Sequence, residues 1–433
     1  MIKFIVKPFS DMFLDIRIPI YVIFFSCLII LMPIALITGP AIPDIFLSIN
    51  ALFFLIFSLK KKLWKYYKNP IFFGFIIFCL YGFIRSIFSE FPIESLTNGG
   101  SLFYFRYVFF SLAVWYLLDN NPYLSDCLLV IVLSCILVVS IDACYQYFVG
   151  VNLFGNEKFS DTRLTSFFGD EPIVGRYISY LSIFAFFLIY QVTKVDKKIF
   201  LISILLLVVC EIVVFLSGER APLFNIFLFS IFILFFLPFF KIYRIMGVII
   251  SITLIVAVAQ LNPISKKRMF EQTFSEMKET HFPFLPYTEL HEQHYVGALK
   301  MFLDKPIIGV GTNLFRYQCQ KEKYRYKDKS CTSHPHHFYL QLLAELGIIG
   351  FLFLFIFYLY ISYLIVRQFF AILFFKSNNA IKFNYFLILI IMFINFWPLI
   401  PNMSFYNNWN NVFIFIPMGY LLKFLYDKKF KLN

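Results

Sequence analysis

Three histidines lie within four residues of one another, at His334, His336 and His337. Histidine is the side chain best suited to accept a proton near neutral pH, so this group is a candidate for general-base catalysis. Pro335 interrupts the group, and a helix is expected to begin just after it. One histidine here would suggest a polar cap at a membrane surface, whereas three favour catalysis. A zinc site is a further alternative, ranked below catalysis because no free thiolate is expected nearby.

A second candidate is Arg220, in the stretch S-G-E-R-A at 217–221 between two apolar runs. An arginine in such a place is costly unless it pairs with an anion or faces a watery cavity. Its planar guanidinium binds phosphate oxygens two at a time, which favours an anionic ligand. The alternatives are an ion pair with Glu219 and a side chain that reaches outward to the membrane surface.

A third candidate is a polar stretch that contains Arg163, Asp170 and Glu171. Its carboxylates could accept a hydrogen bond from a hydroxyl group or bind a divalent cation. They are equally typical of a loop that turns into a helix, where the helix dipole favours acidic side chains. Both interpretations stay open.

The composition determines what holds these residues in place. Sixty per cent of the 433 residues are apolar and 15% are charged, which excludes a water-soluble domain. The net charge of +13 does not indicate a nucleic-acid partner. Most basic residues flank apolar runs, where they serve as topological anchors beside membrane lipids.

Apolar runs recur along almost the whole chain, and a span needs about 20 such residues. The sequence therefore predicts an all-α polytopic membrane protein with about 12 transmembrane helices and one large periplasmic loop of short helices. That loop contains an amphipathic stretch over 290–303. The candidate spans are 18–38, 41–59, 71–89, 101–118, 127–149, 173–192, 199–217, 220–239, 245–262, 348–366, 384–402 and 411–427.

Twelve spans put both termini on one side of the membrane. Twenty Lys and Arg lie in the termini and in the short loops of that side, and almost none in the short loops of the other. The positive-inside rule therefore predicts cytoplasmic termini. We expect nine spans in residues 1–262, a periplasmic loop over 263–335, and a catalytic interfacial helix with three spans in 336–433. On that helix, His337, Gln341 and Glu345 would share a polar stripe.

The stretch from His336 to Gly350 resembles the signature of the O-antigen ligase and polymerase family. These are lipid-linked-oligosaccharide glycosyltransferases of Gram-negative inner membranes. The ligase pattern is His, then Asn, Ser or Gln, then nine residues and Gly-x-x-Gly. His336 occupies the first position and His337 the second, and Gly347 and Gly350 occupy the last ones.

Three other stretches resemble the same family. The stretch at 217–221 is similar to a turn S-G-x-R-x whose arginine, here Arg220, is thought to hold the lipid pyrophosphate. Residues 298–311 are similar to A-x-x-x-F-x-x-x-P-x-x-G-x-G, and residues 163–175 to R-x-x-G-x-F-x-D-x-x-x-x-G. Family members carry a second arginine shortly before the alanine. His291, His294 and Arg316 are the candidates for that charge here.

The resemblance implies a glycan donor on undecaprenyl pyrophosphate, with lipid A–core as the acceptor. His336 would remove the acceptor proton, while Arg220 stabilises the leaving pyrophosphate. Direct displacement would invert the anomeric carbon, and neither a metal nor another cofactor is expected. The substrate-binding residues would be Arg316, His291, His294, His337, Arg163, Asp170 and Glu171.

Several alternatives remain open. A polymerase would share this donor and would use a growing glycan as the acceptor. A transporter or flippase of lipid-linked glycans would also carry intramembrane charges, here Arg85, Arg106, Arg176 and Glu211, but no repeated halves are visible. A non-catalytic scaffold gives no reason for three clustered histidines.

The cysteines fall into two groups. Six lie in apolar segments and are expected to be small buried side chains. Cys319 and Cys331 lie in the predicted outer loop. Because the periplasm is oxidising, we expect them to form a disulfide.

Overall fold

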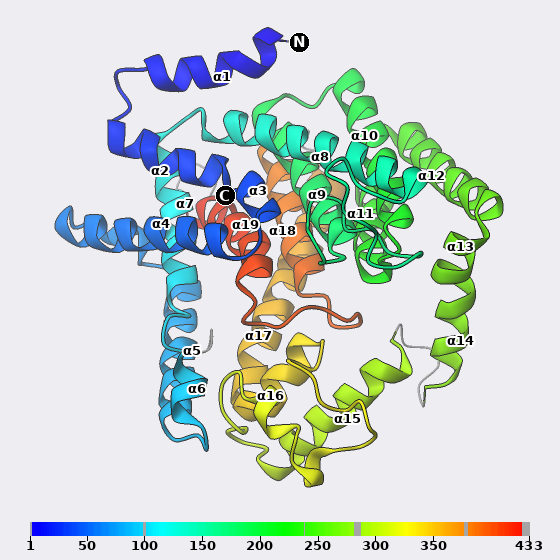
Figure 1. The fold of residues 1–433 in the computed structure, drawn as a ribbon. Helices are drawn as coiled ribbons and strands as arrows, with labels where there is room; N and C mark the ends of the chain where they lie inside the picture. Colours follow the sequence, from blue (N-terminus) through cyan, green and yellow to red (C-terminus); the bar gives the residue numbers. More distant parts are fainter. Residues whose placement is uncertain (1, 98–100, 238, 281–286, 376–379, 427–433) are drawn as a thin grey trace.

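A computed structural model of the chain describes all residues except 1, 98–100, 238, 281–286, 376–379 and 427–433 (Figure 1). The described part is built of helices and contains no named β-strand. Eight helical stretches are long and apolar enough to cross a membrane, and two shorter apolar helices accompany them. The prediction of an all-α polytopic membrane protein is confirmed. The number of twelve spans stays a prediction.

Each predicted span overlaps one helix or a pair of consecutive helices. These helices are α2 (Ile20–Ile30) with α3 (Met32–Ile37), α4 (Ala41–Lys60), α5 (Pro70–Ile87), α7 (Arg106–Asn120), α8 (Leu124–Val149), α9 (Val174–Val192), α10 (Lys197–Leu216), α11 (Arg220–Phe236), α12 (Lys241–Leu261), α17 (Phe338–Phe375), α18 (Ala380–Asn395) and α19 (Asn408–Tyr426). Shorter helices precede or separate them, namely α1 (Ile2–Leu14), η1 (Trp64–Tyr66) and α6 (Pro92–Thr97).

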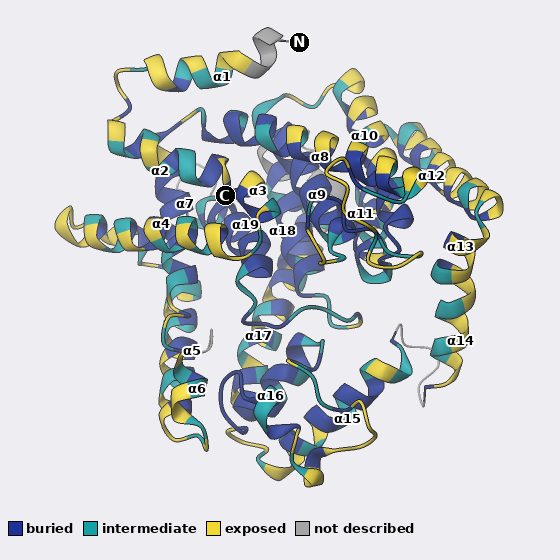
Figure 2. Ribbon diagram, in the orientation of Figure 1, coloured by how far each residue is buried: buried dark blue, intermediate teal, exposed yellow. Residues whose placement is uncertain are grey.

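Burial differs sharply among these helices. Figure 2 shows α9 and α19 almost wholly buried, whereas α4 and α12 carry many exposed residues. The exposed residues of α4 include Ile49, Leu52 and Ile56. Such apolar faces are costly in water and stable against lipid chains. The helices that surround the centre of the bundle therefore present a surface suited to a bilayer.

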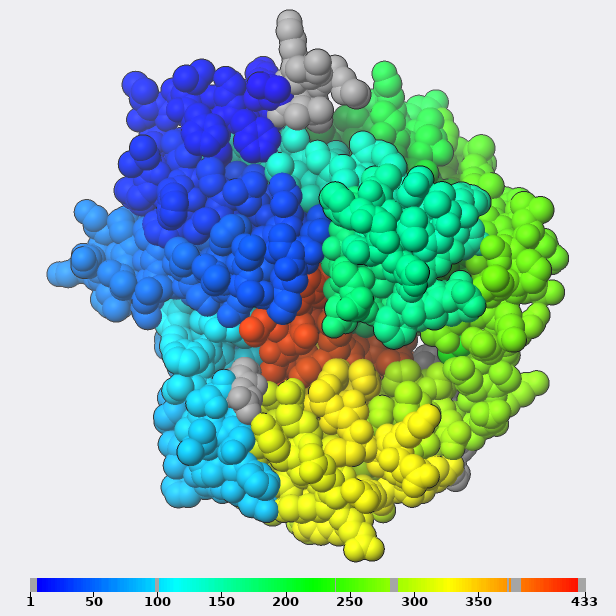
Figure 3. Space-filling model, in the orientation of Figure 1, coloured from blue at the N-terminus to red at the C-terminus, as the bar shows by residue number. Residues whose placement is uncertain are grey.

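The outer-loop segment forms two separate parts (Figure 1). One part contains α13 (Pro263–Lys266), the π-helical turn η2 (Lys267–Glu271) and α14 (Gln272–Lys278), which extend beyond the end of α12. The other contains α15 (Glu289–Asp304), α16 (Phe315–Gln318) and η3 (Glu322–Tyr324). The amphipathic stretch expected over 290–303 is α15, which packs against α17. Figure 3 shows the red C-terminal region in a hollow between the yellow outer-loop surface and the green helices.

A sharp kink at Gly347 divides α17, where φ is +66°. The Val310 N–H donates to the Ala344 carbonyl at 2.9 Å, and the Ile348 N–H donates to the Pro306 carbonyl at 2.8 Å. A Cβ at position 347 would lie 2.3 Å from the Ile307 carbonyl oxygen, so only glycine permits this approach. The two glycine-containing motifs thus pack directly on each other.

Candidate functional site

Five histidines lie together at the N-terminal end of α17. His291 and His294 come from α15, while His334, His336 and His337 precede α17. The centre of the His336 ring lies 4.1 Å from that of His334, 5.4 Å from that of His294 and 5.7 Å from that of His291. The remaining histidine of the chain, at position 281, lies outside the described residues. Residues more than 40 positions apart in the sequence thus form one imidazole cluster.

His336 lies in a turn and not on the helix, because α17 begins at Phe338. Its φ of +54° is left-handed, a conformation that β-carbon-bearing residues rarely adopt. The turn is held by Asn402, from the loop between α18 and α19. The Asn402 N–H donates to the His336 carbonyl at 2.9 Å, and its Oδ1 accepts from the Phe338 N–H at 3.2 Å. The expectation that His336 belongs to the helix was therefore wrong.

The His336 ring is held in its neutral form. Burial is the main cause that lowers its pKa to about 4, and electrostatic interactions with His294 and Arg176 contribute to the same shift. No hydrogen bond from a described residue reaches this ring, and the described neighbours leave both nitrogens open to a ligand. A neutral imidazole with an open lone pair can accept a proton from a hydroxyl.

His337 differs from His336 because the backbone occupies both of its ring nitrogens. Nε2 lies 2.8 Å from the Pro398 carbonyl, to which it donates. Nδ1 then accepts from the Leu340 N–H at 3.3 Å. This second bond satisfies a free N–H at the start of α17, the usual function of an N-cap side chain. His337 therefore positions the helix and is not the proton acceptor.

The three other histidines are also neutral. Burial is the main cause that lowers the pKa of His291 to about 3 and of His334 to about 2, and it lowers that of His294 as well. His291 belongs to a capping box with Thr288 at the start of α15. His294 Nδ1 and His334 Nε2 are buried and have no hydrogen-bond partner among the described residues. These two nitrogens are available to a bound ligand.

The turn at 217–220 brings the arginine candidates together. At Gly218 φ is +75°, and a Cβ there would lie 1.9 Å from the Thr162 carbonyl oxygen. Leu164 N–H also donates to the Ser217 carbonyl at 3.3 Å. The loop that contains Arg163 thus packs over the turn that contains Arg220, which explains the glycine of this motif.

Five half-buried arginines lie near the histidines or near one another. They are Arg163, Arg176, Arg220, Arg268 and Arg316. The charge of Arg176 lowers the pKa of both His334 and His336, that of Arg316 lowers the pKa of His334, and that of Arg220 lowers the pKa of His291. Such effects require the groups to lie within electrostatic range of one another. The cluster is therefore a region of strong positive potential.

Arg220 is paired with Glu276 of α14, and not with its neighbour Glu219. Arg220 Nη1 donates to the Glu276 carboxylate at 2.6 Å, and Nη2 donates to the Arg268 carbonyl at 3.2 Å. Glu219 is buried and accepts from the Gly175 N–H at 2.6 Å. Burial raises the pKa of Glu219 to about 7, against the opposing charges of Arg176 and Arg163. The alternative in which Arg220 pairs with Glu219 was wrong.

The structure does not bring every candidate to the cluster. Asp170 and Glu171 are exposed, and in the described part of the chain neither shares a hydrogen bond or ion pair with the histidines. Arg163 lies close to them in sequence, yet its Nη2 donates to the Pro172 carbonyl at 3.0 Å. Arg316 lies in α16, and its Nη2 donates to Asn313 at 3.3 Å. No three His, Cys, Asp or Glu side chains of the described residues form a metal-binding arrangement.

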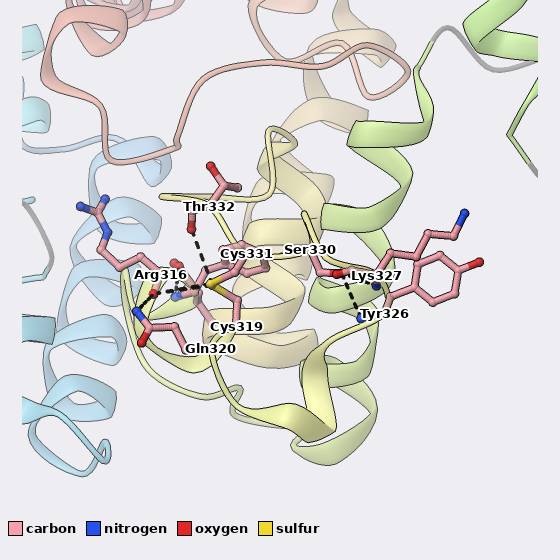
Figure 4. The surroundings of a disulfide bond; sticks show 10 residues. Arg316, Cys319, Gln320, Tyr326, Lys327, Ser330, Cys331 and Thr332 are labelled. Carbon is pink, nitrogen blue, oxygen red and sulfur yellow. Dashed lines mark hydrogen bonds between the residues drawn. A yellow bond between two sulfur atoms is a disulfide. The ribbon is translucent and has the colours of Figure 1, made fainter.

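Cys319 and Cys331 form a disulfide, with their Cα atoms 5.0 Å apart (Figure 4). The Cys319 sulfur lies 3.6 Å from the Arg316 carbonyl oxygen and 3.7 Å from that of Thr332. The bond thus joins the end of α16, which carries Arg316, to the segment that leads to His334.

A cavity of about 260 Å³ opens beside His337. Its walls come from α15, from the start of α17 and from the α18–α19 loop. They are mostly apolar, with Leu299, Leu340 and Leu399, and they also contain Tyr295 and Glu292. Tyr295 lies between the cavity and the histidines, because its ring centre is 5.4 Å from that of His337 and 6.2 Å from that of His291.

The sequence does not predict that three further residues belong to this site. The sequence predicts Arg176 only as an intramembrane charge, and Arg268 belongs to none of the motifs. Asn402 lies 66 positions after His336 in a polar loop without a motif. The sequence offers one signal for Asn402, because an asparagine that follows Pro398 and Pro401 is typical of a turn. This signal does not predict which residue Asn402 would contact.

Part of the chain matches a known family. Residues 201–355 match the family model described as O-antigen ligase. The matched segment contains Arg220, Arg268, Arg316 and all five clustered histidines, together with the kink at Gly347. No curated protein matches the chain.

Proposed function

We propose that the chain transfers a glycan from undecaprenyl pyrophosphate to lipid A–core, as the match of residues 201–355 to the O-antigen ligase family model supports. The observation that carries this proposal is the position of His336. Its neutral ring, with open nitrogens, lies within electrostatic range of Arg176 and within one cluster with Arg220 and Arg316. A proton acceptor beside a phosphate-binding region is what such a transfer requires.

The donor pyrophosphate would bind to Arg220, Arg176 and Arg316. Guanidinium groups bind phosphate oxygens in pairs, and the half-buried positions strengthen the attraction relative to water. Arg220 would exchange its bond to Glu276 for bonds to phosphate. The cavity lined by Leu340 and Leu399 would take the first part of the isoprenoid chain, because it adjoins the site and most of its lining is apolar.

In the chemical step, an acceptor hydroxyl oxygen attacks the anomeric carbon of the donor sugar. A new carbon–oxygen bond forms as the bond from that carbon to the pyrophosphate oxygen breaks. The electron pair of the broken bond stays on the pyrophosphate, where the arginines stabilise it. The hydroxyl proton passes to His336. Attack from the side opposite the leaving group inverts the anomeric carbon, and the step needs no metal ion.

Donor binding would also prepare His336 as a base. Without a ligand its pKa is about 4, which is too low for efficient proton removal at neutral pH. The negative charges of a bound pyrophosphate favour the protonated imidazole and therefore raise this pKa. His336 would become a stronger base only when the donor is in place, which limits proton transfer to the occupied site.

The orientation in the membrane follows from the same scheme. In Figure 1, α1 and the last described turn of α19 lie on the side of the bundle away from α15 and α16. This arrangement supports cytoplasmic termini and a periplasmic site in a bacterial inner membrane. We expect Thr273→Cys to react with an impermeant thiol reagent on intact spheroplasts. Labelling of this residue only after permeabilisation would put the site on the cytoplasmic side and contradict the proposal.

A deletion strain tests the function directly. We expect loss of long surface polysaccharide, bare lipid A–core on a gel, and glycan that accumulates on the lipid carrier. The wild-type gene should restore the polymer, and His336→Ala should not, at equal protein level in the membrane. Lipid A–core that bears a single repeat unit would instead identify a polymerase. Unchanged surface glycans in the deletion strain would exclude both.

A further inference from the structure

Glu345 is a carboxylate inside α17, two residues before the kink at Gly347. It is fully buried, as is Gln341 one helical turn earlier. A buried carboxylate is costly unless hydrogen bonds replace those that it made to water. An apolar side chain would avoid this cost in a helix that is otherwise mostly apolar. The contacts of Glu345 therefore indicate which function the carboxylate serves.

The Glu345 carboxylate binds the backbone of the segment that leads into Arg316. Its Oε2 accepts from the Asn313 N–H at 2.9 Å, and its Oε1 accepts from the Phe315 N–H at 3.0 Å. The Gly311 N–H donates to the Glu345 carbonyl at 2.8 Å. Arg316 follows this segment directly, and its Nη2 donates to the Asn313 side chain at 3.3 Å. Glu345 thus fixes the backbone from which the Arg316 side chain extends.

Gln341 connects the same carboxylate to the loop that holds His336. Its Nε2 lies 3.4 Å from both carboxylate oxygens of Glu345. Its Oε1 accepts from the Phe405 N–H at 2.9 Å. Phe405 lies three residues after Asn402, whose two bonds hold the turn at His336. Two segments that are far apart in the sequence are therefore bound to adjacent turns of one helix.

We propose that Glu345 is a positioning residue, which holds Arg316 at the donor pyrophosphate through the backbone of residues 313–315. Gln341 keeps this segment at a fixed distance from the loop that holds His336. The proposal rests on the function proposed above, in which Arg316 binds the donor. An arginine on a free loop loses backbone entropy when it binds phosphate, whereas an anchored segment has lost that entropy on folding. Glu345 should therefore increase the affinity for the donor without touching it.

A carboxylate that serves stability alone would give a different result. Its replacement would weaken the fold, and any effect on donor binding would multiply with the effect of losing Arg316. A carboxylate that acts through Arg316 has nothing further to position once that arginine is gone. The effects of the two replacements would then not multiply. This difference defines the experiment.

The test is a double-mutant cycle on the full-length protein in nanodiscs of phosphatidylcholine. Lipid-linked glycan is the donor, and lipid A–core is the acceptor. In Glu345→Gln an amide nitrogen would face one of the two N–H groups, so one hydrogen bond is lost. We expect Glu345→Gln and Arg316→Gln each to raise the donor KM roughly tenfold. The double variant should raise it about tenfold as well, instead of about a hundredfold, and kcat should change less than KM.

Two further variants separate positioning from loss of a buried charge or of folding. Glu211→Gln removes a similarly buried carboxylate from α10, where its partner is Ser230, and it should leave the donor KM unchanged. Glu345→Asp keeps the buried charge on a side chain one methylene shorter, which cannot reach both N–H groups. It should also raise the donor KM, and it replaces Glu345→Gln in the cycle if that variant does not fold. Each variant must elute from size exclusion as the wild type does.

Each remaining outcome decides a different question. An increase of about a hundredfold in the double variant would show two independent effects and overturn the positioning function. An unchanged donor KM in a Glu345 variant with a lower unfolding temperature would show that the carboxylate serves stability alone. If Arg316→Gln leaves the donor KM unchanged, Arg316 does not bind the donor and the inference is wrong, while the transfer reaction stands. If the wild-type protein transfers no glycan, the proposed function fails, and this inference with it.

Discussion

Asn402 holds His336 from both sides of its turn. The asparagine N–H donates to the His336 carbonyl, and its side-chain oxygen accepts from Phe338, the next residue but one. The left-handed backbone at His336 costs roughly 1–2 kcal/mol, and these two bonds offset that cost. The loop between α18 and α19 is therefore part of the site, although it lies outside the matched family segment.

Asn402 is a positioning residue on this interpretation, so its loss should affect turnover more than binding. We expect Asn402→Ala to lower kcat about tenfold or more through displacement of His336, with little change in the KM for the donor. Asn402→Asp keeps the accepting oxygen and should retain most activity. Glycan transfer by membranes with equal protein content measures both. A higher donor KM with unchanged kcat would show that Asn402 serves binding instead.

His337 should be replaceable by asparagine. Its Nδ1 accepts the Leu340 N–H at the start of α17, and asparagine is among the best side chains for that function. The bond to Pro398 would be lost, at a cost of about 1 kcal/mol. We expect His337→Asn to support long surface polysaccharide, and His337→Leu to reduce it. Complete loss of activity in His337→Asn would give this ring a chemical function that its hydrogen bonds do not suggest.

The pH dependence should differ between kcat and kcat/KM. The pKa of His336 without ligand is about 4, below its usual value of 6.5, because burial disfavours the charged ring. His336 is then neutral, and competent, at every pH well above 4. The pH dependence of kcat/KM for the donor reports the pKa values of the free enzyme. As the pH is lowered, kcat/KM should therefore decrease with a midpoint near pH 4. The corresponding decrease in kcat should have its midpoint at a higher pH, because bound pyrophosphate raises the pKa of His336.

Two controls accompany this measurement. Samples returned from low pH to pH 7 should regain full activity, which separates titration from unfolding. His337→Asn should leave both midpoints in place, since its ring is not the base. If kcat and kcat/KM decrease at the same acidic pH, donor binding does not change the pKa of His336.

The disulfide between Cys319 and Cys331 should be present in the protein as isolated. Six other cysteines are free, so a maleimide reagent should label six thiols in denatured protein without reductant and eight with it. The closed loop restricts the unfolded chain by about 3 kcal/mol in the entropy model. The double replacement by serine should therefore lower the unfolding temperature in detergent. Eight labelled thiols without reductant would show that the bond does not form.

The sequence predicted the helices well and the site only in part. Apolar runs of span length are a signal that needs no tertiary information, which is why the predicted spans coincide with helices. The S-G-E-R turn and the two glycine-containing motifs were visible as patterns. The sequence does not show why these motifs need glycine, because the contacts of Gly218 with Thr162 and of Gly347 with Ile307 join distant segments. The same limit concealed Asn402, whose bonds to the turn cross more than 60 positions.

Local sequence rules also misplaced two details for physical reasons. A helix start just after Pro335 is the usual preference, but the contact with Asn402 holds His336 in a left-handed turn and delays the helix to Phe338. The nearest acid in sequence to Arg220 is Glu219, yet the Glu219 carboxylate is buried and accepts a hydrogen bond from the Gly175 N–H. Tertiary contacts decided both outcomes.

Glu276 forms an ion pair with Arg220, which we propose as a ligand of the donor pyrophosphate. Replacement of Glu276 should therefore tighten donor binding. Arg220 Nη1 and the Glu276 carboxylate lie 2.6 Å apart, with side chains 21% and 36% exposed. A pair this accessible contributes little to stability, about 1 kcal/mol at most. A phosphate must nonetheless displace the carboxylate. We expect Glu276→Gln to lower the donor KM several-fold, with kcat unchanged or slightly reduced.

The matched variants make this prediction specific to the pair. Glu279→Gln removes an exposed carboxylate one turn further along the same segment, and it should leave the donor KM as it is. Arg220→Lys should raise the KM strongly in both the wild-type and the Glu276→Gln backgrounds, because an ammonium group cannot bind two phosphate oxygens as the guanidinium fork does. If Glu276→Gln instead raises the donor KM, then the carboxylate helps to orient Arg220 for the pyrophosphate and does not compete with it.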